Sequence, residues 1–192
     1  MPDPDSTIRG RRVTLRPVIP EDGDYLLALA RSDPAFTQTL SLAEAADTSE
    51  VTALLRGQFD QRMVELGDAS VRAGYVAAHH RPPVGAGVVR VGTFVSSQYR
   101  ATSVGLEAAA LFISHLFDAR GVRRIEGLML DDALARIGTG LGRFFTLDAT
   151  LRDAAFSMGS FRDVHVLSLT RGEWMRRASR FDAWIGYRKV KA

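Results

Sequence analysis

The 192-residue sequence contains no cysteine, and only two of its 25 basic residues, Lys189 and Lys191, are lysines. Without cysteine the chain can form no disulfide, no thiolate zinc site and no cysteine nucleophile. A reducing compartment fits this composition. The formal net charge of +3 is carried by arginine and is too small to indicate binding to double-stranded nucleic acid.

Long apolar runs are also missing. No stretch approaches about 18 uninterrupted apolar residues, and the N-terminal sequence MPDPDSTIRG is polar where a signal peptide needs an apolar segment. We therefore expect a cytoplasmic protein that does not interact with a membrane. A hydrophobic fraction of 46% can supply a buried core, and at about 100–200 residues per domain we expect residues 1–192 to form a single domain.

The first half of the sequence predicts a strand, two helices and then further strands. Alternating apolar residues around Pro17 predict an edge strand over 11–18. The acidic start after Pro20 predicts a helix to about residue 30, and apolar spacing predicts a second helix over 51–63. Strands are predicted at 71–79, 84–91 and 93–96, and this set looks one strand short between residues 91 and 93.

The second half contains the clearest amphipathic pattern, over 104–116, which predicts a helix that ends at Gly121. The following strand, 124–130, should pair with 93–96 in parallel, because a strand–helix–strand connection requires parallel pairing. Glycines at 138, 140 and 142 predict a mobile segment. The remaining expected elements are a short helix at 132–137, a strand at 144–147, hairpin arms at 154–158 and 164–169, and a helix that begins at the capping box Thr170–Glu173.

The stretch YRATSVGLEA, residues 99–108, leads from a strand into the best-defined helix. Backbone N–H groups at a helix N-terminus lack intrahelical partners, and the helix dipole favours an anion there. Arg100 could add positive charge. A phosphate site is therefore one interpretation, and an ordinary loop with Thr102 or Ser103 as the N-cap is the other.

Three segments resemble the RimJ/RimL-like N-acetyltransferases of the GNAT superfamily: TLRPVIPEDGDYLLAL, YRATSVGLEAAALFISHLFDARGVRRIEG and TLRDAAFSMGSFRDVHVLSLTRGEW. The resemblance extends from Val13 to about Trp184. It implies an α/β (α+β) fold in which a central mixed sheet is flanked by helices and a parallel strand pair splays apart to admit an acyl-coenzyme A. It also implies that N–H groups of the loop bind the pyrophosphate and that strand N–H groups polarise the thioester carbonyl. The implied cofactor-binding residues are Phe94, Val95, Arg100, Ala101, Thr102, Ser103, Val104 and Gly105.

The sequence departs from the family pattern at several positions. Ala101 and Ser103 stand where family members usually carry glycine, and Asp131-Asp132 stands where an asparagine is common. No tyrosine occupies the place of the usual general acid. These departures bear on both the phosphate loop and the proton transfers.

The candidate catalytic residues are Asp132, His165 and His79. Asp132 follows a parallel strand, and α/β folds bind ligands at that edge, although helix capping is the alternative. His79 and His80 are adjacent on a strand, so only one of them can face the cleft. His165 lies in the final strand, within possible reach of an acceptor pocket, whereas His115 falls on an apolar helix face and is expected to be a core residue.

We therefore expect an enzyme, a GNAT-type N-acetyltransferase that uses acetyl-CoA or another acyl-CoA as co-substrate and no metal. The acceptor would be a primary amine of a small molecule or of a protein N-terminus. One alternative is a GNAT-fold transferase that uses acyl-carrier protein or aminoacyl-tRNA in a biosynthetic pathway, and another is a non-catalytic member that only binds a ligand. The arginine-rich segment 171–191 leaves a homodimer open.

Overall fold

The computed structural model describes residues 7–32, 47–48, 58–67, 71–80, 87–100, 102–137, 144–157 and 159–186. Its strands form one eight-stranded sheet in the order β1-β2-β3-β4-β5-β6-β8-β7. The strands are β1 (Ile8–Arg9), β2 (Val13–Pro17), β3 (Asp60–Leu66), β4 (Val71–His80), β5 (Val88–Val95), β6 (Arg124–Leu130), β7 (Thr146–Ser157) and β8 (Ser160–Thr170). Every neighbouring pair is antiparallel except β5 and β6, which run parallel.

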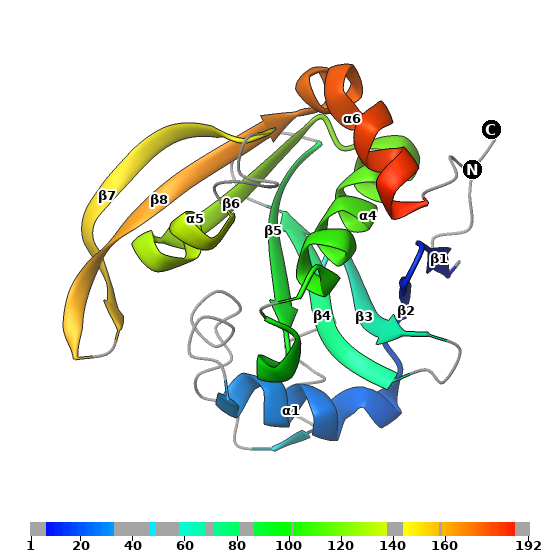
Figure 1. The fold of residues 1–192 in the computed structure, drawn as a ribbon. Helices are drawn as coiled ribbons and strands as arrows, with labels where there is room; N and C mark the ends of the chain where they lie inside the picture. Colours follow the sequence, from blue (N-terminus) through cyan, green and yellow to red (C-terminus); the bar gives the residue numbers. More distant parts are fainter. Residues whose placement is uncertain are drawn as a thin grey trace.

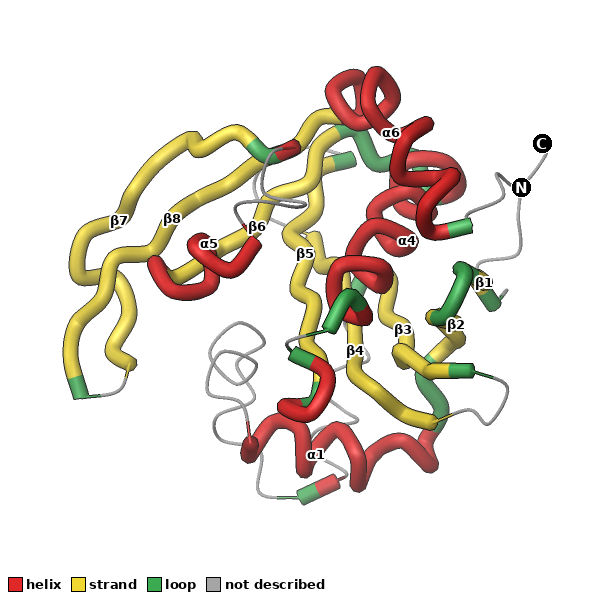
Figure 2. The backbone as a smooth tube through the Cα atoms, viewed as in Figure 1, coloured by secondary structure: helices red, strands yellow, loops and turns green. Residues whose placement is uncertain are grey.

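Helices cover both faces of this mixed sheet (Figures 1 and 2). The helical elements are η1 (Pro20–Asp22), α1 (Gly23–Ser32), η3 (Ser97–Tyr99), α4 (Val104–Ala119), α5 (Asp131–Ile137) and α6 (Arg171–Ile185). Leu26 and Leu29 of α1 pack with Tyr75 of β4 on one face. On the opposite face, α4 and α6 contribute to the larger cluster of buried side chains. Among the described residues no helix is long and apolar enough to cross a bilayer.

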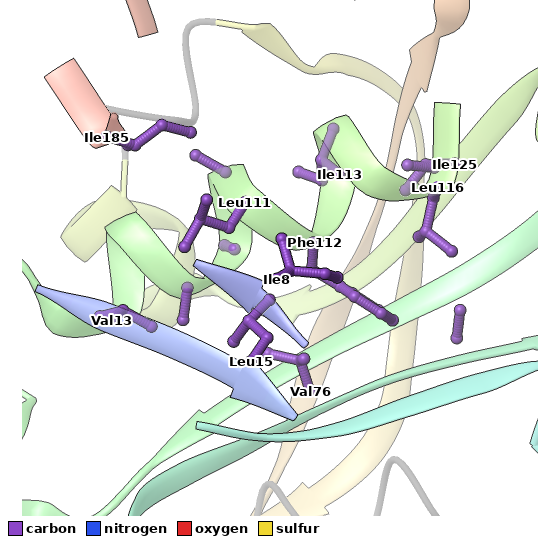
Figure 3. Close-up of a cluster of buried hydrophobic side chains, with 14 of the residues drawn as sticks. Ile8, Val13, Leu15, Val76, Leu111, Phe112, Ile113, Leu116, Ile125 and Ile185 are labelled. Atoms are coloured by element: carbon purple, nitrogen blue, oxygen red, sulfur yellow. The ribbon is translucent and has the colours of Figure 1, made fainter. Parts of the chain in front are cut away.

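Helix α4 is the centre of the larger cluster. Leu111, Phe112 and Leu116 of this helix are fully buried, and Figure 3 shows them between the strands and Ile185 of α6. Because the helix is covered on several sides, its side chains are apolar over most of its length rather than along one stripe. The helix ends before Gly121, whose φ of +66° lies in the left-handed region that glycine adopts without strain.

Several predicted elements are confirmed. The strand 124–130 is β6, and it runs parallel to β5 after the α4 crossover, but it pairs with residues 88–90 of β5 rather than with the expected 93–96. The C-terminal hairpin is present with longer arms, β7 and β8. The capping box also forms: Glu173 Oε2 accepts a hydrogen bond from the Thr170 N–H at 2.8 Å, and the Glu173 N–H donates to Thr170 Oγ1 at 3.3 Å.

Other predictions are wrong. Residues 60–63 were expected at the end of a helix but belong to strand β3. The prediction failed because Asp60 and Arg62 are charged yet buried, paired with each other, so the sequence does not show the apolar pattern of a buried strand. No strand is missing between residues 91 and 93, because β5 continues through Gly92 without a break; the additional strand is β3, which precedes β4. Strand β2 is not at the edge, because the short β1 lies outside it. The predictions for 84–86, Ala101 and the glycine segment 138–142 concern residues outside the described part.

Candidate active site

The parallel strands β5 and β6 pair over only part of their length. Their register joins Val88 to Arg124, Val89 to Ile125 and Arg90 to Glu126. Beyond Arg90 and Glu126 the two strands diverge, as Figure 1 shows. A gap with strand backbone on either side therefore opens toward the C-terminal ends of β5 and β6.

Backbone N–H groups of β5 point into this gap. The Ser96 N–H donates to the Ala73 carbonyl at 2.8 Å, so it faces β4. Because N–H groups alternate in direction along an antiparallel strand, that of Phe94 also faces β4, whereas those of Val91, Thr93 and Val95 face the gap. Of the two strand residues predicted to bind the cofactor, Val95 thus directs its N–H toward the gap and Phe94 packs its ring on the α1 side.

The loop between β5 and α4 is held by its own hydrogen bonds. Thr102 Oγ1 donates to the Tyr99 carbonyl at 2.7 Å and accepts from the Val104 N–H at 3.3 Å. Arg100 and Ser103 have φ values of −62° and −76°, so neither position needs glycine for its backbone conformation. The N–H groups of Gly105 and Leu106, in the first turn of α4, have no intrahelical acceptor and can bind an anion.

The predicted loop residues and the gap lie next to each other. A Cβ added to Gly105 would meet the two methyl groups of Val95 at 3.6 Å, which places the start of α4 against the last residue of β5. Val104 is buried beside this contact, while Thr102 is exposed. The N-terminus of α4 therefore lies next to the end of β5 that borders the gap.

Two residues that the sequence analysis did not select are fixed at the start of α4. Glu107, with a side chain 2% exposed, accepts hydrogen bonds from the backbone N–H groups of Arg12 at 2.7 Å and Val13 at 3.1 Å. Its other oxygen accepts from Arg12 Nε at 3.2 Å. Arg12 Nη2 donates to Ser103 Oγ. The signal in the sequence was an acidic residue within the apolar pattern of the helix, which predicts a buried carboxylate that needs partners.

His165 is part of a line of three polar side chains. Its Nε2 lies 2.5 Å from Asp131 Oδ1, and its Nδ1 lies 3.0 Å from Thr150 Oγ1. The His165 side chain is 12% exposed and that of Asp131 is 66% exposed. Both ring nitrogens of His165 are therefore engaged. Asp132 is the next residue of α5, and its side chain lies outside the described part of the structure.

His79 has a different environment. Its Nδ1 is buried, and no group in the described part of the chain forms a hydrogen bond with it. Burial, assisted by the positive charge of Arg90 on the neighbouring strand, lowers the pKa of His79 below its ordinary value of 6.5. The imidazole is therefore neutral at pH 7.

The two histidines lie on opposite faces of the sheet. Side chains two positions apart on a strand point to the same face. His79 therefore shares a face with Tyr75 and Ala77, which belong to the cluster beneath α1. His165 likewise shares a face with Leu169, which packs in the cluster around α4. His80 points away from His79 and places its ring 4.6 Å from that of Phe59. The structure therefore does not bring the predicted catalytic histidines together.

Two other titratable side chains, His115 and Glu126, have structural partners. His115 is buried, as predicted, and its Nε2 lies 3.2 Å from Asp60 Oδ2. Glu126 is buried on the α1 face at the last paired position of β6, with Arg124 Nε 3.4 Å from its carboxylate. Within the described ranges no group of three or more His, Asp or Glu side chains is placed to bind a metal ion.

Comparison with known proteins identifies the family of this chain. The family model for the GNAT acetyltransferase domain matches residues 12–136. The chain belongs to the GNAT acetyltransferase family. A solved structure described as a probable acetyltransferase of this family, from Chromobacterium violaceum, is 26% identical over 90% of each chain, with a TM-score of 0.68. None of the curated proteins matches the chain in sequence.

Other solved GNAT structures share the fold at lower identity. A GCN5-related N-acetyltransferase from Brucella melitensis is 24% identical, over 94% of this chain and 85% of that one, with a TM-score of 0.67. RimJ of Mycobacterium smegmatis, solved in complex with CoA-disulfide, is 18% identical, over 91% and 95% of the two chains, with a TM-score of 0.65. In the present GNAT chain, the gap beside β5 and the N-terminus of α4 provide N–H donors that suit a carbonyl and phosphate groups.

Proposed function

We propose that this GNAT acetyltransferase transfers an acetyl group from acetyl-CoA to a primary amine of a small molecule or of a protein N-terminus. The observation that carries the proposal is the gap between β5 and β6, which is lined by the N–H groups of Val91, Thr93 and Val95 and continues to the start of α4. A thioester carbonyl in this gap would accept hydrogen bonds from β5. Phosphate groups would bind at residues 100–105.

For acetyl transfer the protein mainly has to position the two substrates and assist proton transfer. The amine nitrogen attacks the thioester carbonyl, the C–S bond breaks, and coenzyme A leaves as the thiol. N–H donors directed at the carbonyl oxygen stabilise its negative charge in the transition state. The amine must lose one proton, so a base is needed within reach of the gap.

We assign the base role to His79. It is neutral at pH 7 and has a ring nitrogen without a partner in the described part of the chain, whereas both nitrogens of His165 are engaged. By extension of the β5–β6 register, Met129, which pairs with His165, is level with Thr93 across the gap. His165 and Asp131 would therefore line the opposite face near the leaving sulfur, and Asp132 stays a further candidate for the base.

Two measurements test the proposal. Calorimetric titration should show that coenzyme A binds much more tightly than pantetheine, because only coenzyme A carries the phosphates that make charge-assisted contacts with the loop. A thiol-release assay with acetyl-CoA and a panel of amines should then show amine-dependent turnover. Equal affinity for coenzyme A and pantetheine would contradict the phosphate assignment.

The same assay separates the alternatives. Tight binding of coenzyme A with no thiol release for any amine would favour a non-catalytic member. No binding of coenzyme A, together with turnover of an acyl-carrier-protein thioester, would favour a different donor. His79→Gln should lower turnover at least tenfold while leaving coenzyme A affinity unchanged, since general base catalysis contributes about 10²–10⁴-fold. Asp132→Asn, measured in parallel, tests the other candidate.

A further inference from the structure

The start of α4 carries a cation that comes from a distant part of the chain. Arg12 precedes strand β2, and its side chain reaches Ser103, the residue just before the first turn of α4. The side chain of Arg12 is 53% exposed, whereas that of Glu107 beneath it is 2% exposed. The guanidinium thus lies at the surface of the phosphate loop and rests on a buried carboxylate.

This position of Arg12 is fixed by several contacts. Glu107 accepts hydrogen bonds from the Arg12 backbone N–H and from Arg12 Nε. The turn before Arg12 packs so closely on α4 that a Cβ at Gly10 would lie 2.5 Å from Leu111 Cδ1 and 2.9 Å from Glu107 Oε1. The backbone and the first part of the side chain are therefore held in place. An arginine fixed in this way loses less side-chain entropy when it binds a ligand.

Ser103 completes the arrangement, and it is one of the residues that replace a family glycine. Its hydroxyl does not cap α4, although a serine before a helix commonly does so. Instead the hydroxyl accepts a hydrogen bond from Arg12 Nη2. Within the described residues no acceptor is bound by Arg12 Nη1. A glycine at 103 could not hold the guanidinium, so the change from glycine links the loop to Arg12.

We propose that Arg12 is a phosphate ligand for the acyl donor, held at the loop by Glu107 and Ser103, and that this contact compensates for the loss of glycine from the loop. The inference rests on the proposed use of acetyl-CoA. A planar guanidinium suits phosphate oxygens, and coenzyme A offers two sources of this chemistry, the pyrophosphate and the 3′-phosphate.

The test is calorimetric binding of coenzyme A, dephospho-CoA and pantetheine to the wild type, Arg12→Gln and Arg11→Gln. Arg11→Gln is the matched control, because Arg11 is the exposed neighbour and the charge change is identical. Arg12→Gln should weaken coenzyme A binding by about tenfold, whereas Arg11→Gln should change it less than twofold. Arg12→Gln keeps the backbone hydrogen bonds from Arg12 and Val13 to Glu107, and thermal unfolding will verify that it folds.

The ligand series identifies the phosphate. An equal loss for coenzyme A and dephospho-CoA places Arg12 at the pyrophosphate, and a loss for coenzyme A alone places it at the 3′-phosphate; both support the inference. Ser103→Gly should weaken coenzyme A binding by about threefold, because the guanidinium loses its anchor. If Arg12→Gln matches Arg11→Gln for coenzyme A, or weakens pantetheine equally, the inference is overturned. If the wild type does not bind coenzyme A at all, the proposed function itself fails.

Discussion

His115 Nε2 lies 3.2 Å from Asp60 Oδ2, and each of the two side chains is 3% exposed. Asp60 also accepts hydrogen bonds from Arg62, and Arg120 Nε lies 3.2 Å from its Oδ2. A buried carboxylate with several donors stabilises a fold only while it is ionised. This contact between strand β3 and helix α4 therefore connects the stability of the sheet to pH.

Acid should unfold the protein partly through Asp60. Burial alone would raise the pKa of Asp60, but the hydrogen bonds from His115 and Arg62 lower it overall, below the ordinary 3.8. The stabilisation is thus present above about pH 3.8 and is lost as pH falls through the lowered value. Asp60→Asn should lower the free energy of unfolding at pH 7 by about 3 kcal/mol and flatten its decline below about pH 4. Urea unfolding measures both effects, with Asp118→Asn on α4 as the control.

Glu107 should be far more sensitive to substitution than Arg12. Glu107→Ala removes the acceptor of two backbone N–H groups and of a guanidinium, and should lower the free energy of unfolding by about 2–4 kcal/mol. Arg12→Gln leaves the backbone bonds intact and should cost less than about 1 kcal/mol, because the ion pair is half exposed. Similar losses in urea unfolding would contradict this order.

His79 should titrate below its ordinary value. Burial and Arg90 lower its pKa, so the unfolded chain binds the proton more readily than the folded one. The contribution of neutral His79 to stability is therefore full above about pH 6.5 and declines as pH falls through the lowered pKa. An NMR titration of the imidazole resonances, with His79→Gln to assign the signal, should show one histidine titrating below pH 6.5. A His79 signal at or above 6.5 would remove the support for its role as a base.

Alanine should destabilise the protein at Gly74 of β4 but should be tolerated at Gly105 of α4. A Cβ at Gly74 would lie 2.2 Å from the Phe94 carbonyl oxygen, so Gly74→Ala must displace β5 and should cost about 2–3 kcal/mol. A Cβ at Gly105 would meet only Val95 methyl groups at 3.6 Å, an ordinary contact. Gly105→Ala should therefore leave the melting temperature nearly unchanged. Equal losses for the two variants would contradict this account.

The sequence predicted the elements whose pattern is local. Strand β6 and the capping box at Thr170 could be located because apolar periodicity and capping residues act within a few positions. Strand β3 could not, because its buried charged residues are paired: Arg62 with Asp60 of the same strand, and Glu65 with Arg16 of β2. A charged residue is predicted to be exposed unless its partner is known, so the sequence of β3 did not show which of its residues are buried.

The candidate site also has parts that a short segment of sequence predicts and parts that depend on distant residues. The loop at 100–105 followed from helix-terminus chemistry and the family resemblance, since both depend on a short continuous segment. The contact between Asp131 and His165 requires β8 to pair beside β6, and the contact between Arg12 and Glu107 joins residues 95 positions apart. Neither partnership leaves a local signal in the sequence. The division of His79 and His165 between opposite faces likewise required the complete sheet.

The three residue pairs between β5 and β6 are the only ladder that connects the β1–β5 part of the described sheet to β6, β8 and β7. The sheet therefore contains a seam, and elastic bending will concentrate there, because fewer hydrogen bonds resist it than elsewhere. A molecule that enters the gap and contacts both strands would connect the two parts of the sheet and resist this bending. The rigidity of the whole sheet, and not only the order of one loop, thus depends on whether the gap is filled.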